Sequence, residues 1–100
     1  MRNWKMPKLN LKGSEKQIRW ATEIVADVYA TVNSNIKLAH DNQWPHPEKW
    51  ETAFDGIISQ LEGFLSKNEK AAVIISCRER FSSDRILYLA NKYVNREALK

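Results

Sequence analysis

The chain contains 100 residues and carries a formal net charge of +4 at neutral pH. That length accommodates one small hydrophobic core, so we expect a single domain. Its 43% hydrophobic and 28% charged residues, with three Gly and three Pro, exclude fibrous and disordered classes. No apolar run approaches the roughly 18 residues of a membrane span, and the first residues lack the apolar block of a secretory signal. We therefore expect a cytoplasmic protein without membrane contact.

The charges are arranged in blocks along the chain. Residues 1–20 contain six basic residues and one acidic residue, residues 21–67 contain three and seven, and residues 68–100 contain seven and four. Both ends are therefore basic and the middle is acidic. Such a distribution suits a polyanionic partner, but it equally allows the basic ends to lie against the protein's own acidic middle.

Residues 1–13 are predicted to form a basic, irregular arm, because they sustain neither helix nor strand periodicity. Cations and apolar side chains are interspersed in the order Arg2, Trp4, Lys5, Met6, Lys8, Leu9, Leu11 and Lys12. Two interpretations remain open. The apolar residues could dock on the body as a strap, or a partner could order the arm and stack on Trp4. Residues 14–100 are expected to form one helical domain.

A first helix is expected to begin at Ser14. Ser14 and Gln17 have the capping-box spacing, in which two side chains satisfy two backbone amides. Apolar residues then recur three and four positions apart as far as Ala39, which is the spacing of a core-facing helix. The polar run at residues 33–35 could interrupt this helix, because Asn and Ser side chains compete for backbone hydrogen bonds. We favour one continuous helix to about His40.

A loop is predicted over residues 41–47, where two prolines are separated by a single residue. A second helix should begin at Pro47, since proline suits a first helical turn and the acidic residues that follow complement the helix dipole. One broad apolar stripe supports this helix: Trp50, Phe54, Ile57, Ile58, Leu61 and Leu65. We expect Trp50 in the core.

Two shorter helices complete the prediction. Residues 66–69 again have capping-box spacing and predict a tight turn before a helix through Arg80. The β-branched residues 73–75 would also suit a strand, but no second strand is available to pair with it. A hydroxyl at residues 82–83 should cap a last helix that runs to about Asn95. The expected fold class is all-α: a small bundle of three or four helices with a basic N-terminal arm.

Residues with catalytic or metal-binding chemistry form no recognisable site. His40 lies near a helix end and His46 lies beside prolines, where surface or capping roles are simpler. Cys77 follows an aliphatic run, as a buried structural thiol does, and a single Cys excludes an internal disulfide. The His and acidic residues of 40–48 match no zinc or calcium spacing, and the isolated glycines form no phosphate loop. We expect no enzyme activity, no cofactor and no metal.

Aromatic and basic residues are the stronger functional signals. Trp20 falls at the margin of the first helix's apolar stripe beside Lys16 and Arg19, so it either forms an aromatic–basic patch or is covered by another element. Trp4 and Trp44 could each be a packing lid or a partner contact. Three cations form a row opposite the apolar face of the last helix: Arg85, Lys92 and Arg96. Such a row can bind phosphate or can simply face solvent.

Residues 8–28, KLNLKGSEKQIRWATEIVADV, resemble the opening of small uncharacterised bacterial and phage proteins. Those proteins carry a Lys-Leu-x-Gly-Ser-Glu-Lys-Gln-Ile-x-Trp-Ala-x-x-Ile signature, and this chain has one extra residue before the glycine. The matching residues are Gly13, Ser14, Glu15, Lys16, Gln17, Ile18, Trp20 and Ala21. The resemblance implies a phage or mobile-element origin and supplies no catalytic residues.

Two function classes are consistent with these patterns. In the first, a non-enzymatic helical binding protein engages nucleic acid or a nucleoprotein through its basic ends. The contact residues would be Trp4, Lys12, Lys16, Arg19, Trp20, Arg85, Lys92 and Arg96. In the second, a protein-binding inhibitor of a host defence system, of the anti-CRISPR kind, blocks a basic partner with an acidic face. That face would comprise Asp41, Trp44, Glu48, Glu51, Asp55 and Glu62. A homodimer is a further candidate assembly.

Overall fold

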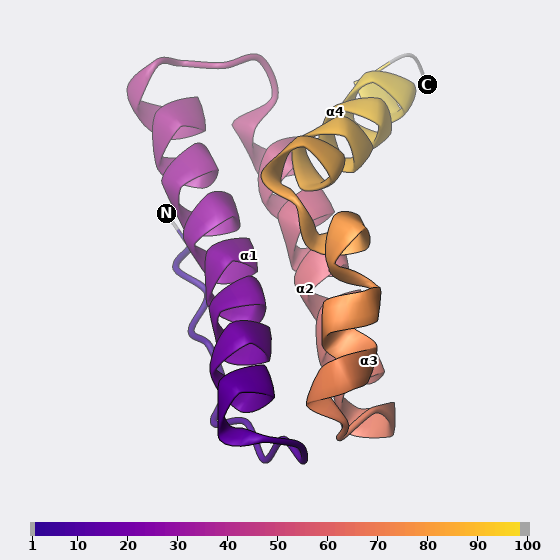
Figure 1. The fold of residues 1–100 in the computed structure, drawn as a ribbon. Coiled ribbons are helices and arrows are strands. Elements are labelled where there is room, and N and C mark those ends of the chain that lie inside the picture. The colour runs from indigo at the N-terminus through magenta and orange to yellow at the C-terminus, as the bar shows by residue number, and fades with distance from the viewer. Residues whose placement is uncertain (1, 99–100) are drawn as a thin grey trace.

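The computed structural model describes the backbone of residues 2–98 and the side chains of residues 2–96. Residues 99–100 of the predicted helical domain lie outside this range. The elements are α1 (Glu15–Asp41), α2 (Pro47–Lys67), α3 (Ala71–Ser76), the 3₁₀-helix η1 (Arg78–Phe81) and α4 (Ser83–Ala98). Helices α1 and α2 run antiparallel, while α3, η1 and α4 follow one another like a third helix that bends midway (Figure 1). The predicted small all-α bundle is confirmed.

Helix α1 begins with the predicted capping box. The Gln17 backbone amide donates to Ser14 Oγ at 3.2 Å, and the Ser14 amide donates to Gln17 Oε1 at 3.1 Å. The helix then continues without interruption through residues 33–35. Asn35 Nδ2 donates back to the Thr31 carbonyl at 2.8 Å, so this polar side chain bonds within the helix and does not break it. The prediction of one continuous helix is confirmed.

The N-terminal arm packs against the body as a strap, running beside α1 (Figure 1). Trp4 is only 6% exposed. Its backbone amide donates to Asn33 Oδ1 at 2.8 Å, and Asn33 Nδ2 donates to the Trp4 carbonyl at 2.7 Å. The indole Nε1 donates to Asp55 Oδ1 at 3.1 Å, and the ring lies edge-on to Phe54. The assignment of Trp4 as a partner contact is therefore wrong, because α1 and α2 enclose it.

The end of the arm joins the turn between α2 and α3. The Lys12 amide donates to the Glu69 carbonyl at 2.7 Å, and the Ala71 amide donates to the Lys12 carbonyl at 2.9 Å. The arm therefore accepts a hydrogen bond from the first amide of α3. The predicted capping box at residues 66–69 does not form, because α2 continues to Lys67 and the N-cap residue of α3 makes no side-chain cap bond.

The segment that follows α2 differs from the prediction of a single helix through Arg80. Helix α3 is only six residues long and is followed by η1, so the chain bends before α4. The β-branched run of α3 is helical, and Ile74 is fully buried. The Arg85 amide donates to Ser82 Oγ at 3.3 Å, which confirms the predicted hydroxyl cap near the start of α4.

The core lies where α1 meets the other three helices. Its largest fully buried side chains are Phe54, Ile36, Ile74, Ile86, Val25, Val28 and Val32. Trp50 was expected in the core but is only half-buried. It packs against Phe54 and is partly covered by Trp44, whose ring centroid lies 5.1 Å away. Trp44 is therefore a packing lid over this end of the bundle.

Replacing Gly56 or Gly63 by Ala should raise the free energy of unfolding by about 1 kcal/mol each, because alanine favours a helix interior. A Cβ at either position would meet no heavy atom within 4 Å. Gly13→Ala should instead lower it by more than about 1 kcal/mol. Gly13 has a φ of +150°, and a Cβ there would lie 2.9 Å from Gln17 Oε1. Urea denaturation measures all three, and destabilisation by Gly56→Ala would contradict the packing described.

Candidate nucleic-acid interface

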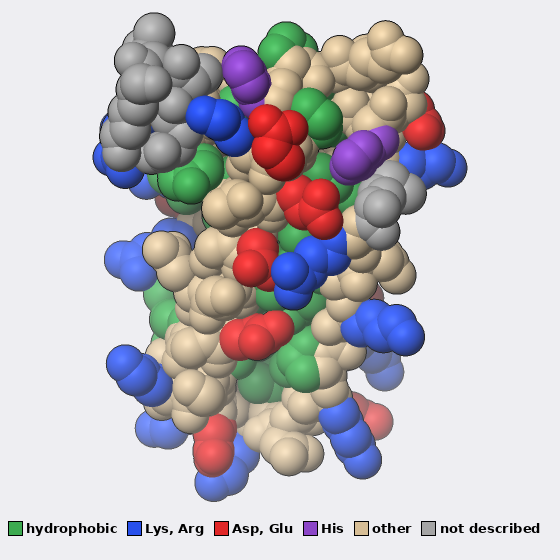
Figure 2. All heavy atoms as spheres, turned by 180° about the vertical axis from the view of Figure 1, so that it is seen from behind, with side chains coloured by type: hydrophobic (Ala, Val, Ile, Leu, Met, Phe, Trp, Pro, Cys, Tyr) green, Lys and Arg blue, Asp and Glu red, His purple; other side chains and the backbone are tan. Residues whose placement is uncertain are grey.

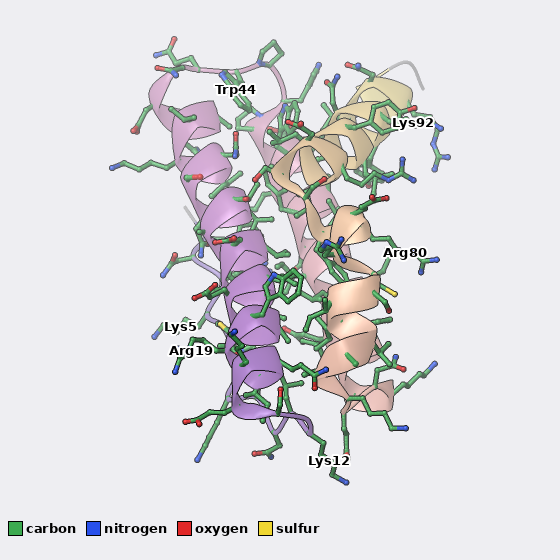
Figure 3. The ribbon with its side chains drawn as sticks, in the orientation of Figure 1. Lys5, Lys12, Arg19, Trp44, Arg80 and Lys92 are labelled. Atoms are coloured by element: carbon green, nitrogen blue, oxygen red, sulfur yellow. The ribbon has the colours of Figure 1, made fainter. Side chains whose placement is uncertain are left out.

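Four of the predicted contact residues lie around the beginning of α1. Lys16 and Trp20 are one helical turn apart on α1, and Arg19 adjoins Trp20 in sequence. Lys12 extends from the end of the bundle next to α1, while Arg19 points outward from the side of the same helix (Figure 3). The backbone bridge between Lys12 and Lys70 brings a further cation to this end.

Trp20 is 47% exposed, and its partner is a residue that sequence reasoning missed. The Arg78 guanidinium lies over the indole ring, 5.5 Å from the ring centroid. Arg78 Nη1 also donates to the Ile75 carbonyl at 3.0 Å, which helps to fix the guanidinium in place. The indole is therefore partly covered by a residue of η1 while remaining 47% exposed, and the cation over its ring comes from η1 and not from Lys16 or Arg19.

We call this region the Trp20 surface and define it as Lys12, Lys16, Arg19, Trp20, Lys70 and Arg78. All six residues are exposed. Lys12 Nζ lies 3.0 Å from Glu69 Oε2, but these side chains are 75% and 59% exposed, so the ion pair contributes little and exchanges readily with solvent. An exposed indole thus has one cation over its ring, and further exposed cations at this end of the bundle can approach a polyanion.

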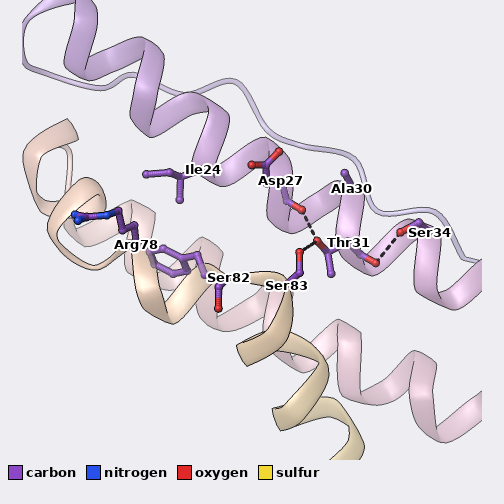
Figure 4. A pocket seen from close by; sticks show the side chains of 9 residues that line it. Ile24, Asp27, Ala30, Thr31, Ser34, Arg78, Ser82 and Ser83 are labelled. Atoms are coloured by element: carbon purple, nitrogen blue, oxygen red, sulfur yellow. Dashed lines mark hydrogen bonds between the residues drawn. The ribbon is translucent and has the colours of Figure 1, made fainter.

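A shallow cavity of about 420 Å³ continues from Arg78 along α1 (Figure 4). Its hydroxyls already bond to one another and to the backbone. Thr31 Oγ1 lies 2.9 Å from Ser83 Oγ and donates to the Asp27 carbonyl at 2.7 Å. The Asp27 carboxylate also lines the cavity and disfavours a phosphate there. The cavity therefore marks the limit of the Trp20 surface. The hydrogen bond between Thr31 and Ser83 within it joins α1 to the start of α4.

The other predicted cations lie elsewhere. Arg85, Lys92 and Arg96 are exposed on α4, and Arg85 lies over the ring of Tyr88, 5.9 Å from its centroid. Lys92 and Arg19 point to opposite sides of the molecule (Figure 3). The two basic ends of the sequence therefore form separate surfaces on a body 45 Å long.

The predicted acidic face is centred on α2. Figure 2 shows acidic side chains in a broken column along the back of the molecule, with basic side chains on either side. Four carboxylates of this face have neighbours within the chain: Asp55 pairs with Arg2 at 3.0 Å, Glu51 with His40 at 3.9 Å, Glu48 with His46 at 4.0 Å, and Glu62 accepts a hydrogen bond from Tyr29 at 3.4 Å. Asp41 is exposed at the end of α1. Of these contacts, the one between Asp55 and Arg2 joins two fully charged groups, and both side chains are largely exposed, so the acidic face stays accessible.

Tyr29 is the titratable group that its surroundings perturb most clearly. Burial, the negative charge of Glu62 and the hydrogen bond to Glu62 together raise its pKa to about 12, and burial has the largest effect. Neutral tyrosine is favoured because ionisation would place a phenolate in the core next to a carboxylate.

Within residues 2–96, no three or more His, Cys, Asp and Glu side chains are grouped so as to hold a metal ion. Cys77 is a half-buried free thiol. None of the helices in the described part of the chain combines the length and apolar character needed to cross a membrane.

Comparison with family models, curated proteins and solved structures finds no match to this chain. Function is therefore inferred from the arrangement of its residues.

The stability of the protein should fall as the pH rises from 10 to 12, and Tyr29→Phe should weaken this dependence. The folded-state pKa of about 12 exceeds the ordinary value of 10.0, so the contribution is complete below pH 10 and is lost as the pH approaches 12. Chemical denaturation of both proteins across this range measures the difference. Identical pH profiles would show that Tyr29 titrates normally in the folded protein.

Proposed function

We propose that this protein is a non-enzymatic nucleic-acid-binding protein that holds unpaired nucleotides at the Trp20 surface. The observation that carries the proposal is the half-exposed indole of Trp20, which has the Arg78 guanidinium over its ring and Lys16 one helical turn away on α1. Stacking on aromatic rings combined with cationic contacts to phosphate is the usual basis of single-strand binding. A base must be unpaired or splayed out to offer its face to an indole, so single strands are favoured over duplexes.

The residues of the Trp20 surface have different roles in the proposed binding. Trp20 provides a platform for a base, and Arg78 holds the indole from one side while adding positive charge. Lys12, Lys16 and Arg19 supply phosphate contacts, which position the strand without reading its sequence. The protein acts by occupying the strand, and no bond is made or broken.

The inhibitor hypothesis has less support from the geometry. Trp44, the aromatic anchor of that hypothesis, packs on Trp50. A protein partner for this face would therefore gain less from Trp44 than the sequence alone predicts.

Binding of a labelled oligothymidine of about 12 nucleotides, followed by fluorescence anisotropy in roughly 50 mM salt, tests the proposal. Trp20→Ala should weaken binding by about 1–3 kcal/mol, whereas Trp20→Phe should retain most of it because a ring remains. Lys16→Ala should make the negative slope of log affinity against log salt concentration shallower by about 0.7, because one phosphate contact is lost. Lys92→Ala, which removes an exposed cation on α4, is the matched control and should change neither quantity.

No binding at low salt would overturn the proposal. So would equal losses from Lys16→Ala and Lys92→Ala, because these would indicate general attraction to a basic protein and not a defined surface. A duplex bound more tightly than the single strand would exclude base stacking on Trp20.

A further inference from the structure

A second surface, an apolar groove, lies between α2 and α4. It consists of two adjoining cavities of about 410 and 400 Å³ that share Ile57, Gln60 and Leu89. The remaining apolar lining is Val28, Leu61, Phe64, Phe81, Ile86, Ala53, Gly56 and Tyr93. Leu89 is 39% exposed. We call this feature the α2–α4 groove.

One side of the groove is basic. Arg80 and Arg85 line it directly. Lys92 follows Leu89 by three residues and Arg96 by seven, so the helical repeat places both on the same side of α4 as Leu89. Arg80 and Lys92 point outward from the same side of the molecule (Figure 3). None of the residues described as lining the two cavities is a carboxylate, so the charged side chains that line the groove beside its apolar surface are basic.

The α2 side of the groove is uncharged and contains a glycine that the fold does not require. Gly56 lies in the interior of α2, where glycine is less favourable than alanine. A Cβ at this position would meet nothing within 4 Å, so neither packing nor backbone conformation explains the glycine. Its effect is to leave the backbone of α2 open to close approach from outside.

We infer that the α2–α4 groove binds an acidic amphipathic helix of another protein. Apolar side chains recurring every three to four residues on such a helix would enter the groove, in the manner of other helix-in-groove complexes. Its acidic residues would face Arg80, Arg85, Lys92 and Arg96, and Gly56 would allow the two backbones to approach. From Thr52 to Phe64 the groove follows about three turns of α2, so a helix of about 12 residues would fill it.

The basic row of α4 then has a role that the sequence did not suggest. The sequence allows Arg85, Lys92 and Arg96 either to bind phosphate or to face solvent, but Arg85 borders a surface that is apolar over several side chains. A polynucleotide offers no matching apolar stripe, whereas an amphipathic helix offers both an apolar stripe and carboxylates. The groove and the Trp20 surface are therefore expected to act independently.

A pair of synthetic helical peptides tests the inference. Both carry the same leucine stripe, and their polar faces are either glutamate-rich or lysine-rich. The glutamate peptide should bind the full-length protein at least about tenfold more tightly at low salt, measured by fluorescence anisotropy. The double variant Arg85→Glu, Lys92→Glu should reverse this preference.

Two glycine variants provide a matched comparison. Gly56→Gln places an uncharged side chain in the groove and should weaken binding of the glutamate peptide by at least about tenfold. Gly63→Gln makes the same change on the same helix at a position that lines neither cavity, and binding should be unchanged. Both variants should remain folded, because both positions open onto free space.

Equal binding of the two peptides, or binding of neither, would overturn the inference. A dimer in sedimentation that Gly56→Gln dissociates would also overturn it, by identifying a second copy of the chain as the occupant. Loss of oligothymidine binding in Gly56→Gln would show that the groove serves nucleic acid instead. Trp20→Ala should leave peptide binding intact, so the failure of the nucleic-acid proposal and the failure of this one are distinguishable.

Discussion

The backbone of Trp4 is held by both polar atoms of a single side chain, that of Asn33 on α1. Its indole reaches across to Asp55 and Phe54 on α2, so one residue of an irregular arm joins the two long helices. This attachment directs the rest of the arm toward the beginning of α3, where Lys12 bonds to the backbone on both sides of the turn. Trp4 is therefore part of the core of the protein, and the rest of the arm packs against the body through partly buried apolar residues.

The docked arm also determines which charges remain available. Arg2 is drawn to Asp55, so part of the basic N-terminus is placed against the acidic face of α2. Lys12, Lys16 and Arg19 stay exposed around the beginning of α1, and the cations of α4 lie on another side of the molecule. The blocks of charge seen in the sequence thus become one partly compensated face and two separate basic surfaces.

Local signals predicted α1, α2 and α4 well, because apolar periodicity and the hydroxyl caps at Ser14 and Ser82 act within a few residues. The features that the sequence did not predict depend on contacts between segments that are distant in the chain. The beginning of α3 depends on a carbonyl of the arm, which the capping-box spacing at residues 66–69 could not reveal. The burial of Trp4 depends in the same way on α1 and α2, and the cation over Trp20 comes from η1. Such pairings follow from how helices meet and not from the pattern within each one.

Native-state hydrogen exchange of the Trp4 backbone amide tests this account most directly. If Trp4 is part of the core, its amide should exchange as slowly as the buried amides in the middle of α1, because exchange at either place would require global unfolding. Exchange of the Trp4 amide at the rate of an unstructured peptide, while α1 and α2 remain protected, would contradict the account.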